Sequence, residues 1–160
     1  MPLPPPPPPP PPPLSFKTAI PVSTPNPPTI AAKGPPGALL LELNTYNGSP
    51  FNDHWAYFVR SSTNPDVGVA IEAIGDVGTG FRLQIERNHD FSLSSNPMTT
   101  RIPLQWVDAE CVNEQAMLNN GVPITTDVPV CSFEESLHKV KVPEKTLNSI
   151  QHNKRVERVY

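Results

Sequence analysis

The sequence predicts an α+β domain: an antiparallel sheet of about five strands with two or three short helices, preceded by a disordered proline-rich tail. Of the 24 prolines, 17 lie within residues 1–37, so residues 38–160 are expected to form the single folded domain. Between residues 38 and 107, short apolar runs are separated by turn-forming residues, which is typical of an antiparallel meander. After residue 107, the spacing of apolar residues changes to that of short helices.

The predicted tail contains an unbroken run of ten prolines, from Pro4 to Pro13. Because proline has no backbone N–H and a fixed φ, this run is expected to adopt polyproline II geometry, with a rise of about 3.1 Å per residue. Such a run acts as a spacer, or it docks in the aromatic groove of a polyproline-binding domain. Both interpretations stay open, although the nearest basic residue is Lys17, which disfavours an SH3 domain as the partner.

Five apolar runs are the predicted strands. The first two are joined by the turn-prone residues 47–50 and are expected to form a hairpin. The second run is apolar on both of its faces, so we expect it to lie centrally in the sheet and to be covered on both sides. Pro103 lacks an N–H for a ladder hydrogen bond, which places the fifth run at an edge. The runs are residues 38–43, 54–59, 67–73, 81–86 and 101–107.

Up to three helices are predicted after the sheet. The first spans residues 108–119. The second begins at Ser132, because a serine followed three residues later by Glu135 is typical of a capping box, and it ends before Pro143. The third spans residues 144–152.

His54 stands at the start of the second predicted strand, before a run of aromatic and β-branched residues. An imidazole changes its charge near neutral pH, and a strand can hold it in one orientation. His54 is therefore a candidate general base for a thiol or a water molecule. The alternative is a core histidine whose ring is satisfied by a backbone carbonyl.

Nine short segments follow one another in a recognisable order: Leu43 to Tyr46, His54 to Ala56, Gly75 to Val77, Gly80-Phe81, Arg87-Asn88, Asp90-Phe91, Phe133-Glu134, Val142-Pro143 and Leu147-Asn148. In this order they resemble a group of uncharacterised fungal proteins. Those proteins are in turn similar to circularly permuted papain-like domains, the class that includes NlpC-type peptidases and lecithin retinol acyltransferase-like enzymes. The resemblance covers most of residues 39–160 and none of the tail.

The resemblance implies a thiol mechanism, in which a histidine on a strand precedes a nucleophilic cysteine at the N-terminus of a helix. It makes His54 the base and Glu72 the residue that orients the imidazole; alternatively, Glu72 is a strand residue that faces solvent. The cysteine is expected just beyond Tyr160, so the domain is expected to be incomplete at its C-terminus. Within the chain, Cys131 is the candidate nucleophile because a helix N-terminus lowers a thiol pKa. Cys111 is expected to be a small buried residue.

The leading hypothesis is therefore a truncated or non-catalytic permuted papain-like domain. Enzyme activity is not expected of this chain, because the implied nucleophilic cysteine is absent. Two alternatives remain. One is a thiol hydrolase or acyltransferase that uses His54 with Cys131, and the other is a proline-rich interaction protein.

Several other functional classes are disfavoured. The net charge of −3 and the sparse basic residues at the C-terminal end argue against nucleic-acid binding. No cofactor or metal is expected, since the sequence has no phosphate-binding glycine loop and no histidine pair at helical spacing. With no apolar run long enough to span a membrane, no signal sequence and only two cysteines, an intracellular, cytoplasmic protein is expected.

Overall fold

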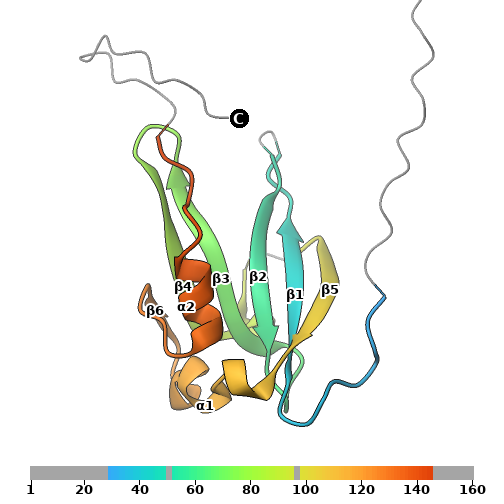
Figure 1. The fold of residues 1–160 in the computed structure, drawn as a ribbon. Helices are drawn as coiled ribbons and strands as arrows, with labels where there is room; N and C mark the ends of the chain where they lie inside the picture. The colour runs from blue at the N-terminus through green and yellow to red at the C-terminus, as the bar shows by residue number, and fades with distance from the viewer. Residues whose placement is uncertain (1–28, 50–51, 96–97, 146–160) are drawn as a thin grey trace, which may run out of the picture.

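The computed structural model describes residues 29–49, 52–95 and 98–145, and in this part of the chain six antiparallel strands form one sheet (Figure 1). Its strand order is β5-β1-β2-β3-β4-β6, which confirms the edge position of the fifth predicted strand. The predicted meander is right only for the first four strands, because the fifth pairs with the first and not with the fourth. All five predicted strands are present, and the short β6 is an addition to them. The strands are β1 (Leu39–Tyr46), β2 (His54–Arg60), β3 (Val67–Asp76), β4 (Gly80–Asp90), β5 (Thr100–Val107) and β6 (Ile124–Thr126).

Side chains alternate between the two faces of the sheet, and β2 shows which residues share a face. This strand lies between β1 and β3, so its predicted central position is confirmed. The side that carries His54, Ala56 and Phe58 is called the His54 face, and the side that carries Trp55, Tyr57 and Val59 is called the Tyr57 face.

The hydrophobic core lies on the Tyr57 face, where two short helices pack against the sheet (Figure 1). The helix α1 (Glu114–Met117) contributes Met117, and α2 (Ser132–His138) contributes Phe133 and Leu137. The strand residues of this core are Leu39, Leu41, Val59, Val69, Ile71, Ile85 and Val107.

The expectation that β2 is covered on both sides is wrong for its first half. Trp55 is 63% exposed and Tyr57 is 40% exposed, whereas Phe58 and Val59 are buried. The reason is that α1 and α2 are short and pack near Val59, at the other end of the strand.

The helix predicted over residues 108–119 is broken into three pieces. These are the 3-10 helix η2 (Ala109–Cys111), α1, and the 3-10 helix η3 (Asn119–Gly121). Asn119 and Asn120 have φ values of 49° and 53°, a left-handed conformation that no continuous helix contains. Asparagine tolerates this conformation better than most residues, so the helix stops there.

The predicted start of α2 at Ser132 is confirmed, but the predicted capping box is wrong. Cys131 is the N-cap residue, and its carbonyl accepts the N–H of Glu135 (3.0 Å). The Ser132 hydroxyl donates instead to the carbonyl of Cys111 (3.4 Å), which ties the start of α2 to η2.

A buried ion pair joins α2 to β4. Nη1 and Nη2 of Arg87 each lie 2.9 Å from one carboxylate oxygen of Glu134, and the two residues are 4% and 0% exposed. Arg87 also donates to the carbonyls of Met117 and Val128, and Glu134 accepts the N–H of Val130. The pair therefore satisfies three backbone groups of α1 and of the segment before α2, besides its own two charges.

The last part of the predicted tail lies against β5. Nε1 of Trp106 donates to the carbonyl of Ala31 (2.9 Å), and a side chain at Gly34 would collide with the Trp106 ring. Contacts with the sheet thus begin before residue 38, earlier than the predicted boundary. The rest of the predicted tail, residues 1–28, lies outside the described residues, as does the predicted third helix beyond residue 145.

Phe58→Ala is expected to lower the free energy of unfolding by about 3–5 kcal/mol, because it leaves a cavity at a fully buried position beside Phe91. Chemical denaturation measures this loss. Leu93→Ala is the control, since Leu93 is 83% exposed and its truncation should change stability by less than about 0.5 kcal/mol. A loss below about 1 kcal/mol for Phe58→Ala would contradict a tightly packed site.

Arg87→Met is expected to cost about 3–5 kcal/mol, because the carboxylate of Glu134 stays buried without its partner. The double variant Arg87→Met/Glu134→Leu removes both charges and should recover only part of the loss. The carbonyls of Met117 and Val128 would still lack their donor. Urea denaturation of both variants measures the difference, and full recovery in the double variant would show that the backbone contacts contribute little.

Candidate functional site

His54 and Glu72 meet on the His54 face. Nε2 of His54 lies 2.5 Å from Oε2 of Glu72. The His54 side chain is 44% exposed and that of Glu72 is 16% exposed, so the imidazole is open to solvent while the carboxylate is largely shielded. The structure thus brings together two of the three residues singled out from the sequence.

The strand register explains this contact. Ala56 lies opposite Glu72 on β3 and opposite Asn44 on β1, and Glu72 lies opposite Gln84 on β4. His54 is two residues before Ala56 on the same face, so its ring reaches Glu72 diagonally past a small side chain. Nε2 of Gln84 donates to the other carboxylate oxygen of Glu72 (3.4 Å), which helps to hold that carboxylate in place.

Tyr46 and Asn44 extend this group of polar side chains onto β1. The rings of Tyr46 and His54 are 5.9 Å apart, centroid to centroid. Burial and the negative charge of Glu72 raise the pKa of Tyr46, and the nearby amide of Asn44 only partly opposes this shift. Asn44 is 0% exposed, and neither its amide nitrogen nor its amide oxygen reaches hydrogen-bonding geometry with a described residue. The site therefore holds a protonated phenol beside a fully buried amide.

The contact with Glu72 determines which nitrogen of His54 can act as a base. A carboxylate only accepts hydrogen bonds, so the neutral imidazole carries its proton on Nε2 and keeps a lone pair on Nδ1. Nδ1 is then the atom that can take a proton from a thiol or a water molecule.

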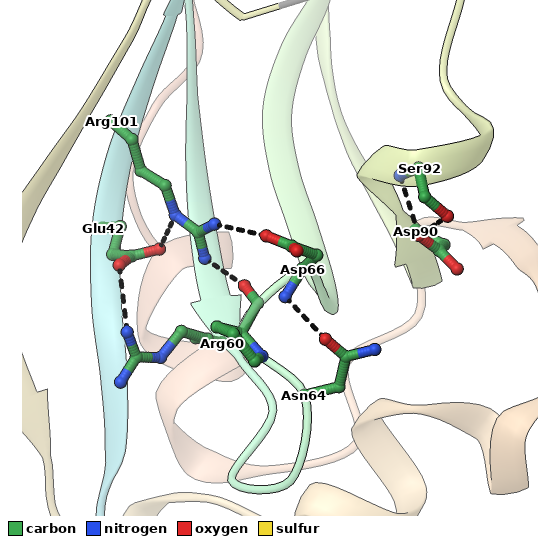
Figure 2. A network of polar contacts seen from close by, with 8 residues as sticks. Glu42, Arg60, Asn64, Asp66, Asp90, Ser92 and Arg101 are labelled. Carbon is green, nitrogen blue, oxygen red and sulfur yellow. Dashed lines mark hydrogen bonds and ion pairs between the residues drawn. The ribbon is translucent and has the colours of Figure 1, made fainter.

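The other end of the His54 face is closed by a network around Arg101 of β5 (Figure 2). Arg101 contacts the buried carboxylate of Glu42, and its Nη1 lies 3.2 Å from Oδ1 of Asp66 in the β2–β3 turn. Its guanidinium also lies over the rings of Phe58 and Phe91, 5.1 and 5.3 Å from their centroids. These contacts tie β5 to the β2–β3 turn, so the exposed part of the face is the end that carries His54.

Both cysteines lie away from His54. Cys111 and Cys131 pack against the core on the Tyr57 face, where Val59 and Ile71 are buried. Burial raises the pKa of the Cys131 thiol, although hydrogen bonds from nearby backbone groups oppose this effect. The expected lowering of that pKa by a helix N-terminus is therefore wrong, and the sheet separates Cys131 from His54.

Sequence reasoning missed Asn44, Tyr46 and Gln84. The β3–β4 hairpin could have identified Gln84. Glu72 and Gln84 are the same number of residues from Gly78 in the turn, so they lie opposite each other across the hairpin. Asn44 and Tyr46 share the alternation of Glu42 on β1, which places all three on one face. Nothing local in the sequence shows that the amide of Asn44 is buried.

Residues 41–158 match the model of a family of unknown function, DUF6540. The chain belongs to this family. The DUF6540 match includes His54, Glu72 and both cysteines. No curated protein and no solved structure matches the chain. The function must therefore be argued from the geometry of the site.

The described residues hold neither a cluster of metal-ligating side chains nor a membrane-spanning helix. In residues 29–49, 52–95 and 98–145, no three His, Cys, Asp or Glu side chains come close enough to hold a metal ion. Over the same ranges, no helix has the length and apolar character needed to cross a membrane.

At alkaline pH, neutral His54 is expected to carry its proton on Nε2, because Glu72 accepts that hydrogen bond. Long-range ¹H–¹⁵N correlation spectra identify the tautomer from the two nitrogen shifts of the ring. Glu72→Ala should weaken the preference. Glu86→Ala is the matched control, since this carboxylate contacts His89 on the same face. A dominant Nδ1-protonated form in the unmodified chain would contradict the assignment of Nδ1 as the base.

Proposed function

We propose that this chain is a permuted papain-like domain that carries the base of a thiol mechanism without a nucleophile of its own. His54 is the base, and Glu72 orients its ring. The observation that carries this proposal is the 2.5 Å contact between Nε2 of His54 and Oε2 of Glu72, on a face that holds neither cysteine.

The arrangement of the strands supports this proposal. The resemblance implies a histidine on a strand and a polar residue that orients it, and β2 and β3 supply them side by side.

Under this proposal the chain is not catalytic by itself. Its two cysteines, Cys111 and Cys131, both pack into the core on the Tyr57 face. Direct proton transfer between a thiol and an imidazole requires hydrogen-bond reach, and here the sheet lies between them. The alternative enzyme that pairs His54 with Cys131 would have to displace α2, which the ion pair of Arg87 and Glu134 holds in place.

In a Cys111→Ala chain, iodoacetamide is expected to label Cys131 slowly at neutral pH. Burial raises the pKa of this thiol, so its thiolate fraction at pH 7 is below that of an ordinary cysteine with a pKa of about 8.5. Labelling should rise only as the pH approaches the raised pKa. Mass spectrometry of labelling rates between about pH 6 and pH 10 measures this profile, with the denatured chain as the reference for an ordinary thiol.

His54→Ala is expected to leave the labelling profile of Cys131 unchanged, because the two side chains lie on opposite faces. If the Cys111→Ala chain instead reacted rapidly at neutral pH and the same chain with His54→Ala did not, Cys131 and His54 would be paired. The thiol hydrolase or acyltransferase alternative would then replace this proposal.

A further inference from the structure

An apolar groove of about 340 Å³ lies on the Tyr57 face, beside the core. Strand residues that include Ile71 and Leu83 form its floor, and Leu137 with residues 140–143 forms one wall. That wall is held to the sheet, because the carbonyl of Pro143 accepts the N–H of Phe81 in β4 (3.1 Å). The groove is therefore formed by segments that are hydrogen-bonded to one another. It lies on the face opposite to His54.

Two aromatic side chains line this groove and are open to solvent. Trp55 is 63% exposed and Tyr57 is 40% exposed. They are two residues apart on β2, so their Cα atoms are about 6.6 Å apart along the strand. Among the described residues, the indole N–H of Trp55 and the hydroxyl of Tyr57 have no hydrogen-bond partner. Exposed aromatic rings with free donors suit a proline-rich ligand, whose rings pack on them and whose carbonyls lack internal partners.

We propose that this groove binds a polyproline II helix, and that its occupant is the run from Pro4 to Pro13 of the same chain. Such a helix has three residues per turn, so each of its three edges carries a proline every third residue, about 9.3 Å apart along the axis. All side chains of the run are identical, so every register offers a proline to each aromatic ring. The run needs no backbone N–H for this contact, and proline has none to offer.

The run can reach the groove. Residues 14–28 separate it from the segment that lies against Trp106, and any chain of fifteen residues can span at most about 50 Å. Trp106 and Trp55 are five positions apart along the strands and two strands apart, which is about 20 Å across the sheet. The spare length allows the chain to pass around the edge at β5. Because the run is tethered, even a weak affinity is enough to fill the groove.

The test compares the full chain, labelled with ¹⁵N-tryptophan, with a variant in which residues 4–13 are replaced by alternating glycine and serine. The Trp55 indole resonance is expected to differ between the two. Free decaproline peptide, added to the replaced chain, should move this resonance saturably towards its position in the intact chain. The Trp106 indole is an internal control and should not move during the titration, because its N–H is already bonded to Ala31.

Two substitutions in the replaced chain test the contact itself. Tyr57→Phe removes only the hydroxyl donor and is expected to weaken decaproline binding about three- to tenfold. Val77→Ala is the matched control, because Val77 is exposed but lies outside the groove, and it should leave the affinity unchanged.

An identical Trp55 resonance in the intact and replaced chains would overturn the proposal. A difference that grows with protein concentration would also overturn it, since the occupant would then be the run of a second copy. The same holds if removal of residues 146–160, and not replacement of the run, shifts the Trp55 resonance, because the C-terminal segment would then fill the groove.

Discussion

The buried ion pair between Arg87 and Glu134 decides how the helical part of the chain lies on the sheet. Removing two charges from water costs several kcal/mol per ion, so an isolated pair would contribute little to stability. Here the same side chains also satisfy three backbone groups between α1 and α2, which would otherwise be buried without partners. With Glu134 held against β4, Phe133 and Leu137 pack into the core, and the adjacent Cys131 lies on the same side. The ion pair thus helps to hold Cys131 on the side of the sheet opposite to His54.

One face of the sheet is apolar and the other carries polar side chains. The alternation of residues along β1 shows the reason. Leu39 and Leu41 face the core and Leu43 lines the groove on the same side, while Glu42, Asn44 and Tyr46 point to the His54 face. A buried carboxylate such as Glu42 requires a cation, and Arg101 supplies it at the closed end. At the other end, Glu72 contacts His54 and Gln84, and the side chain of His54 is 44% exposed. The solvent-exposed end of this face is therefore the end that carries His54.

The features that were predictable depend on local pattern, and those that were not depend on distant contacts. Alternation along β2 and the hairpin register are enough to place Glu72 within reach of His54. By contrast, Arg87 and Glu134 are 47 residues apart, and nothing near either residue indicates that they pair. The broken helix over residues 108–119 follows from asparagines in a left-handed conformation, which composition does not specify. The papain-like resemblance stays a prediction, because the DUF6540 family has no known function with which to compare it.

The exposure of Trp55 and Tyr57 leaves free energy of apolar burial unused by the described part of the chain. Aromatic side chains bury about 150–250 Å² each, so leaving these two partly exposed forgoes on the order of 5 kcal/mol of burial. That amount is comparable with the whole stability of a marginal domain. A further strand cannot recover it, because the residues lie on the face of a central strand and not at an edge. A ligand that needs no backbone pairing can cover this surface, and a proline helix is such a ligand. The tail that cannot join the sheet is therefore chemically suited to cover the part of the sheet that the helices leave open.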